Sequence, residues 1–168
     1  MTYLINGPDI AYIHAQNAAS GFFCGKDGAD VMSHFMETVT HAITIGVPAS
    51  EAWATISDVV QLHARVAPGL VMDTRLEDGD DVRIATLANS AAQTEHIISN
   101  DPETMRLAWT ASGRPWTRHK ASLQIRADGA ACTATSMADV FPQAAAASFA
   151  HFVELGLATL KAHVEPAS

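Results

Sequence analysis

The chain has 168 residues, of which 48% are hydrophobic and 17% charged, a balance that is typical of a globular protein and excludes a disordered one. Its length fits a single domain with a sizeable buried core. The formal net charge of −8 would repel phosphate backbones and anionic lipid headgroups, so we expect neither nucleic-acid binding nor membrane insertion.

The cysteine and histidine patterns favour a protein without disulfides or a bound metal. Cys24 and Cys132 are too few for a disulfide framework and have no metal-type spacing. The eight histidines include no pair at the helical i, i+4 spacing and no Cys/His cluster. The first residues lack a basic start followed by an apolar run, and no apolar stretch approaches about 20 residues, the length that spans a bilayer. We therefore expect a cytoplasmic protein with reduced thiols.

Residues 1–37 differ in character from the rest of the chain. They include the glycine-punctuated stretch NAASGFFCGKDGAD, which has no sustained periodicity and is typical of a loop. The signals for regular structure sharpen from residue 38 onward. We expect an N-terminal extension of uncertain structure over residues 1–37 and one domain over residues 38–168.

A strand and two short helices are predicted at the start of the domain. THAITIGV, residues 40–47, alternates in the way of a strand with one packed face. PASEAWATISD follows and predicts a short helix, with Ser50 as its N-cap and Glu51 in the first turn, where the helix dipole favours a carboxylate. VVQLHARVAPG predicts a second short helix that Pro68 and Gly69 end.

The middle of the chain reads as a series of strands separated by turns. Strands are predicted in LVMDTRLE, VRIATLAN, AQTEHIIS, TMRLAWTAS, WTRHKASLQIRA and CTATSMADVF, with turn chemistry such as DGDD, NDPE and DGA between neighbours. Short strands with turns at such regular spacing predict a meandering antiparallel sheet.

A long helix is predicted from Pro142 to Glu165, because proline suits the first position of a helix. An apolar stripe runs along it within an arc of about 100° and comprises Phe149, Phe152, Val153, Gly156 and Leu160. Only the sheet can cover that stripe. The element order therefore predicts a curved sheet wrapped around one helix.

Three segments carry a resemblance to a known family. HAITIGVPASEAWATISDV, VRIATLANSAAQTEHI and ADVFP, in this order, resemble the START-like SRPBCC superfamily, and specifically its polyketide cyclase/dehydrase branch, over residues 38–165. The resemblance implies an α+β helix-grip fold, in which a curved antiparallel sheet grips the C-terminal helix around a deep apolar cavity. Members include aromatase/cyclases, plant abscisic-acid receptors and lipid carriers, so the fold alone does not settle the function.

Glu95 and His96 are adjacent on one predicted strand and must point to opposite faces. The resemblance implies that Glu95 faces the cavity, since the receptors carry the same threonine–glutamate pair there, and that His96 faces outward. In a cavity Glu95 would act as a hydrogen-bond acceptor or a general base. The alternative is a register shifted by one residue, with Glu95 solvated and His96 inside.

Other polar positions also follow from the resemblance. His119 matches a position that often holds a cavity-facing tyrosine, and there it would move a proton or bind a ligand hydroxyl; otherwise it is a buried histidine satisfied by the backbone. The aromatase/cyclases carry an arginine two residues beyond the Glu95 position, where this chain has Ile97, and that difference weakens a cyclase interpretation. The orientation of Arg83 is left open.

The ligand-binding candidates are mostly apolar. We predict Trp109, Met137, Phe149, Phe152, Gly156 and Leu160 as cavity residues, although core residues would show the same pattern. Trp53 is assigned to packing between the first helix and the sheet.

Two functions from different classes fit this pattern. The first is an aromatase/cyclase- or dehydrase-type enzyme that acts on an aromatic or polyketide-like substrate with Glu95 and His119 as catalytic groups and without a cofactor. The second is a non-catalytic binder or carrier of a hydrophobic small molecule or lipid. A protein-interaction module would require an exposed apolar patch. The ligand and the oligomeric state are not predicted.

Overall fold

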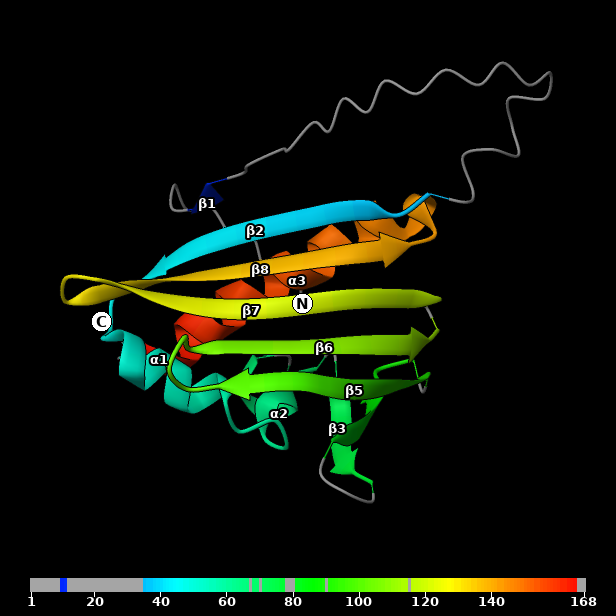
Figure 1. The fold of residues 1–168 in the computed structure, drawn as a ribbon, viewed down its shortest axis with the longest axis horizontal. Helices are drawn as coiled ribbons and strands as arrows, with labels where there is room; N and C mark the ends of the chain where they lie inside the picture. Colours follow the sequence, from blue (N-terminus) through cyan, green and yellow to red (C-terminus); the bar gives the residue numbers. More distant parts are fainter. Residues whose placement is uncertain are drawn as a thin grey trace, which may run out of the picture.

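The structure, a computed structural model, describes residues 10–11, 35–66, 68–69, 71–77, 81–89, 91–114 and 116–165. An antiparallel sheet forms one layer, and helices cover its inner face (Figure 1). The strands lie in the order β1-β2-β8-β7-β6-β5-β4-β3. Their bounds are β1 Ile10–Ala11, β2 Glu37–Ile45, β3 Val71–Leu76, β4 Val82–Leu87, β5 Ala92–Asp101, β6 Arg106–Gly113, β7 Arg118–Asp128 and β8 Ala131–Phe141.

The strands alternate between buried and exposed residues because only one face of the sheet is packed. In β8, Cys132, Ala134, Ser136, Ala138 and Val140 are buried, and the residues that alternate with them are more exposed. Every predicted strand of the domain is present, so the predicted antiparallel sheet is confirmed. In addition, β1 pairs with β2, which places a short part of the predicted extension at the edge of the sheet.

Two short helices follow β2, as predicted: α1 spans Ala49–Ile56 and α2 spans Leu62–Val66. The prediction of Ser50 as the N-cap of α1 is wrong. Pro48 occupies the cap position and makes no side-chain capping bond, and its carbonyl accepts hydrogen bonds from the backbone N–H groups of Glu51 and Ala52. Ser50 lies inside the helix because the extended backbone turns two residues earlier than the serine suggests.

The C-terminal helix α3 spans Ala146–Val164 and follows a single 3₁₀ turn, Gln143–Ala145. Pro142 precedes that turn, so the helical region begins where the proline predicts and the α-helix begins slightly later. The backbone N–H of Gln143 donates to the carbonyl of Phe35 at 3.0 Å, which joins the start of this region to the chain just before β2. Figure 1 shows α3 lying along the inner face of the sheet. The predicted helix-grip arrangement is confirmed.

One end of the space between α3 and the sheet is filled by α1. Ala49, Ala52, Trp53 and Ile56 of α1 are buried in a cluster that also takes in apolar residues of α3, β2 and the central strands. Trp53 is part of this cluster and does not border the cavity described below, which agrees with its assignment to helix–sheet packing.

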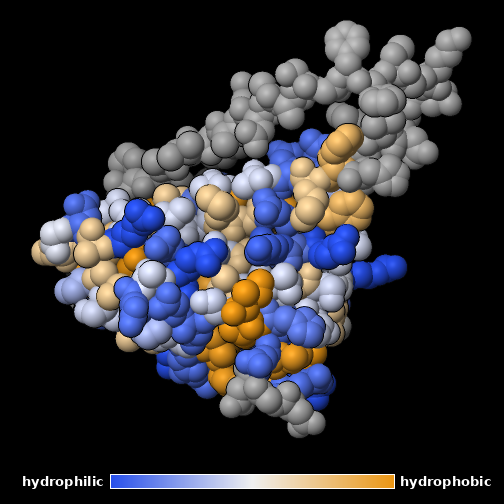
Figure 2. Space-filling model, in the orientation of Figure 1, coloured by the Kyte–Doolittle hydropathy of each residue, from blue (hydrophilic) through white to orange (hydrophobic). Residues whose placement is uncertain are grey.

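The outer face of the sheet is mostly hydrophilic, with a smaller apolar area (Figure 2). Among the described residues, the large apolar side chains that stay exposed are Phe35, Met36, Met72, Ile98 and Met137. No helix in the described part of the chain has both the length and the apolar composition needed to cross a bilayer.

Candidate functional site

A cavity lies between the sheet, α2 and α3. Its volume, measured as the space open to the centre of a water-sized sphere, is about 110 Å³. On the same measure a single water molecule needs roughly 10–15 Å³. The cavity is therefore large enough for part or all of a small organic molecule. Its walls are mainly aliphatic and aromatic, and the described residues that line it are Leu62, Val66, Val71, Thr74, Arg83, Ala85, Leu87, Gln93, Glu95, Trp109, Trp116, His119, Ala121, Leu123, Ser136, Phe149, Phe152, Val153, Gly156 and Leu157.

The structure decides between the two registers that were open for β5. Glu95 is 7% exposed and lines the cavity, whereas His96 is exposed on the outer face. The carboxylate is therefore the inward-facing member of the adjacent pair. A buried carboxylate requires hydrogen bonds or a cation, because taking an unpaired charge out of water is costly.

Arg83 supplies that cation. Its Nε donates to Glu95 Oε2 at 2.6 Å, and its Nη2 contacts the same oxygen. Its Nη1 donates to the carbonyl of Val59 at 2.6 Å. The side chain of Arg83 thus faces the cavity, which answers the orientation left open from sequence. The guanidinium on the neighbouring strand therefore compensates the charge of the inward-facing carboxylate.

Strand register explains how these groups come together. Arg83 on β4 is paired with Glu95 on β5, Glu95 with Ala111 on β6, and Ala111 with His119 on β7. These four residues form one row across the inner face, here called the Arg83–His119 row. Neighbouring strands lie about 4.8 Å apart, so the backbones of Glu95 and His119 are separated by roughly 10 Å. Only the small side chain of Ala111 lies between them in the row.

His119 lies in an aromatic cluster at the end of this row. Its ring centroid is 4.6 Å from that of Phe149 and 6.2 Å from that of Trp116, and Trp116 in turn packs edge-on against Phe152 at 4.8 Å. Burial in this apolar surrounding lowers the pKa of His119 from 6.5 to about 4. The imidazole is therefore neutral near pH 7. Its Nδ1 is buried and has no hydrogen-bond partner among the described residues.

Four of the six predicted ligand-binding residues border the cavity: Trp109, Phe149, Phe152 and Gly156. The prediction of Met137 is wrong, because its side chain is 50% exposed on the outer face of β8. The prediction of Leu160 is also wrong. It is fully buried in the cluster around α1 and does not line the cavity, since the stripe on α3 continues past the end of the hollow space.

Gln93 and Trp116 are two of the cavity residues that were not singled out from sequence. Gln93 is two positions before Glu95 on β5 and therefore on the same face, so strand alternation would have found it once Glu95 was placed inside. Trp116 follows a turn and has no periodic signal. Its Nε1 donates to Ser148 Oγ at 3.1 Å, which fixes the indole against the start of α3.

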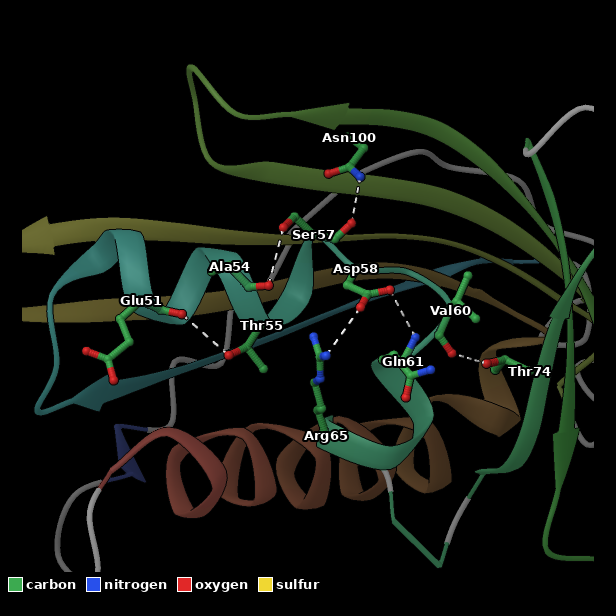
Figure 3. A network of polar contacts seen from close by, with 10 residues as sticks. All are labelled: Glu51, Ala54, Thr55, Ser57, Asp58, Val60, Gln61, Arg65, Thr74 and Asn100. Atoms are coloured by element: carbon green, nitrogen blue, oxygen red, sulfur yellow. Dashed lines mark hydrogen bonds and ion pairs between the residues drawn. The ribbon is translucent and has the colours of Figure 1, made fainter.

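The connection between α1 and α2 is attached to three strands by side chains. Asn100 of β5 donates to the carbonyl of Ser57 at 2.8 Å, and Thr74 of β3 donates to the carbonyl of Val60 at 2.5 Å (Figure 3). Arg83 of β4 donates to the carbonyl of Val59, which lies between Ser57 and Val60 in the same segment. The ion pair in the cavity is thus bonded directly to the segment that leads into α2, which contributes Leu62 to the cavity wall.

A metal site is not formed by the described residues, which contain no group of three or more His, Cys, Asp or Glu side chains that could hold an ion. The polar groups of the cavity-lining residues are instead one ion pair, a neutral imidazole, an amide, two indole N–H groups and two hydroxyls. This arrangement can bind polar substituents and exchange protons.

Comparison with known proteins agrees with the geometry. None of the curated proteins matches the chain in sequence. XoxI from Bacillus cereus has 16% identity and a TM-score of 0.67, with 77% of this chain and 96% of that chain covered. A START superfamily protein from Mycobacterium smegmatis has 14% identity and a TM-score of 0.63, with 76% and 97% covered. The Zhui aromatase/cyclase from Streptomyces sp. R1128 has 16% identity and a TM-score of 0.59, with 77% and 91% covered.

At these identities the solved structures establish a shared fold and nothing more specific. The sequence profile of one family, described as polyketide cyclase/dehydrase and lipid transport, matches residues 36–165, which is most of the chain. The cavity and the Arg83–His119 row both lie within that range. The chain therefore belongs to the polyketide cyclase/dehydrase and lipid transport family and has its START-like, helix-grip fold.

Proposed function

We propose that the protein binds an aromatic or polyketide-like small molecule in this cavity and acts on it by acid/base chemistry, as an aromatase/cyclase- or dehydrase-type enzyme that needs no cofactor. The observation that carries the proposal is that Glu95 and the neutral His119 face one aromatic-walled cavity from strands two apart in a single row. Cyclisation and dehydration of carbonyl compounds both begin with removal of an acidic C–H proton.

The two groups suit complementary roles. Glu95 Oε2 is held by Arg83, and its second oxygen would take the proton from a carbon next to a carbonyl. His119 would keep its imidazole neutral and donate a hydrogen bond to the carbonyl oxygen as negative charge develops there. The roughly 10 Å between the two backbones leaves room for a planar ring or enolisable chain. The apolar walls would exclude water and orient the substrate.

A surrogate reaction tests whether the cavity contains a working base. Base-promoted ring opening of 5-nitrobenzisoxazole removes one C–H proton as the N–O bond breaks, and the phenolate product is followed by its absorbance. We expect the wild-type protein to accelerate this reaction over Glu95→Gln by at least about a hundredfold, the usual contribution of a general base. Glu95→Gln keeps the hydrogen bond from Arg83, so circular dichroism should show an intact fold.

The second candidate is a non-catalytic binder or carrier of a hydrophobic molecule. The Arg83–Glu95 pair favours it, because two of the guanidinium contacts already occupy one oxygen of the carboxylate. Native mass spectrometry of the purified protein would reveal a co-purified apolar molecule under either proposal. Equal reaction rates for wild type and Glu95→Gln, with the probe bound by both, would reject the catalytic role and leave the carrier.

A further inference from the structure

The cavity contains buried polar groups that the proposed chemistry does not use. Gln93 is 3% exposed, and its amide Nε2 has no hydrogen-bond partner among the described residues. The indole Nε1 of Trp109 is likewise buried and without a partner there. Both residues line the cavity. Buried N–H groups without an acceptor are rare in folded proteins, because each has lost its hydrogen bonds to water.

These unused groups are donors. The indole nitrogen of tryptophan can only donate, and an amide nitrogen also only donates. Oxygen Oε2 of the Glu95 carboxylate is already engaged by Arg83. The two unpartnered groups outside the proposed chemistry therefore offer a ligand donors and not acceptors.

The two donors lie on opposite sides of the Arg83–His119 row. Gln93 pairs with Gly113, and Trp109 pairs with Ile97, four residues further along β5. At about 3.3 Å per residue, these positions are roughly 13 Å apart along the strands, with Glu95 between them. Both side chains are long enough to reach toward the centre from either side, so a ligand over Glu95 and His119 would meet a donor at each end.

We infer that the bound molecule is an apolar ring compound that carries carbonyl-type oxygens without donor hydrogens, and that Gln93 and Trp109 select it over hydrocarbons of the same shape. This inference rests on the proposed function, because it concerns the ligand of the same cavity. It goes further by assigning recognition to two residues that take no part in proton transfer.

Fluorene and 9-fluorenone are matched probes, since they share a tricyclic skeleton and differ by one carbonyl oxygen. Their dissociation constants are measured by equilibrium dialysis, and each is corrected by the octanol–water partition coefficient of the probe. We expect 9-fluorenone to bind about tenfold more tightly than fluorene after this correction, as one hydrogen bond to a buried donor implies. Gln93→Leu/Trp109→Phe should abolish the preference while both probes still bind.

A spectroscopic readout distinguishes hydrogen bonding from packing. The indole N–H resonance of Trp109, assigned in a ¹H–¹⁵N spectrum by its loss in Trp109→Phe, should move downfield with 9-fluorenone and much less with fluorene. The single variants Gln93→Leu and Trp109→Phe show which donor binds the one carbonyl of the probe. The N–H resonance of Trp116, which already donates to Ser148, provides the internal control.

The outcomes separate the two proposals. Equal corrected affinities for the two probes, or a preference that survives in Gln93→Leu/Trp109→Phe, would overturn this inference and leave the proposed function standing. Binding of neither probe at its solubility limit would overturn both, because the cavity would not accept an apolar ring molecule at all.

Discussion

The two halves of α3 cover the same sheet, but one half is packed against it and the other borders a cavity. Its C-terminal half packs Leu160 against α1 in a continuous apolar cluster, and Leu157 both joins this cluster and borders the cavity. Its N-terminal half places Phe149 and Phe152 beside a hollow that contains an ion pair and a buried imidazole. Figure 1 shows α1 beside the C-terminal end of α3, where its side chains fill the space against the sheet. The packed half supplies stability, and the hollow half retains polar groups that a filled core would exclude.

The largest expected effect on stability comes from removing one partner of the ion pair beside the cavity. Glu95→Leu removes the carboxylate and leaves the Arg83 guanidinium buried and uncompensated. We expect the free energy of unfolding at pH 7 to fall by about 3–5 kcal/mol in urea denaturation. The double variant Arg83→Met/Glu95→Leu should recover most of that loss, since it removes both charges. A Glu95→Leu protein as stable as wild type would mean that the pair is solvated.

The packed half should respond to loss of volume more strongly than the hollow half. Leu160→Ala deletes a fully buried side chain, and we expect it to cost about 2–5 kcal/mol of unfolding free energy. Leu62→Ala is the matched control, because this leucine lines the cavity and is only partly buried. Its cost should be less than half as large, because its loss enlarges a space that already exists. Equal costs measured by urea denaturation would contradict the division into two halves.

His119 should make the hollow half sensitive to acid. Its pKa is about 4 in the folded protein and 6.5 when exposed, so between these values the unfolded chain binds a proton that the folded protein does not. The contribution of His119 to stability is complete above pH 6.5 and is lost as the pH falls toward 4. At 1.36 kcal/mol per pH unit, the loss reaches about 3 kcal/mol.

The control for this acid sensitivity is His119→Phe, which keeps an aromatic ring in the cluster and cannot be protonated. Urea denaturation of both proteins between pH 4 and 7.5 gives the difference between their unfolding free energies. The titration of carboxylates is common to both proteins and cancels in this difference. Parallel profiles for the two proteins would show that His119 is charged in the fold or solvated.

Smaller changes in the unfolding free energy are expected from replacing two glycines by alanine. A Cβ on Gly156 would lie 3.7 Å from Val66 Cγ1, an ordinary contact, so Gly156→Ala should raise the unfolding free energy by about 0.5–1 kcal/mol through helix propensity. Gly113→Ala is the control with the opposite sign. Its φ is 131°, and a Cβ there would lie 2.5 Å from the carbonyl oxygen of Ala92. A loss of stability for Gly156→Ala would indicate that the α2–α3 contact is tighter than described.

The smallest effect is expected from shortening the N-terminal extension. We predict that the domain unfolds cooperatively without residues 1–34, because β2, α3 and the cavity lie outside them. Retaining Phe35 keeps its carbonyl for the N–H of Gln143. Thermal unfolding should therefore change little. Loss of a cooperative transition would show that residues 1–34 belong to the core.

The fold could be predicted because its determinants are local. Alternation and turn residues marked each strand, and the apolar stripe marked the inner face of α3. Alternation could also have placed Met137 correctly, since it shares its face of β8 with Thr135 and Asp139, which point away from the core. Leu160 could not be separated from the cavity residues of the same stripe, because its surroundings depend on where α1 lies.

The ion pair at the site was beyond sequence reasoning for a different reason. On β4 the outward-facing Val82 and Ile84 are as apolar as the inward-facing residues Ala85 and Leu87, so alternation gives no sign that Arg83 points inside. Its partner follows only from the pairing of β4 with β5, which joins residues twelve positions apart. The chain has Ile97 where the resemblance would place an arginine, and the arginine that does line the cavity, Arg83, lies on the adjacent strand.

The Arg83–His119 row also constrains how this cavity can be altered. Its functional groups are spaced by the backbone ladder, so a group can be moved only to another inward-facing position, about 4.8 Å away on the next strand or roughly 6.6 Å away along the same strand. Intermediate separations are not available by substitution alone. Placing a functional side chain at position 111, or at another inward-facing position beside it, would therefore give one of a few fixed distances from Glu95 and His119. This makes the cavity suitable for systematic redesign toward molecules of different length.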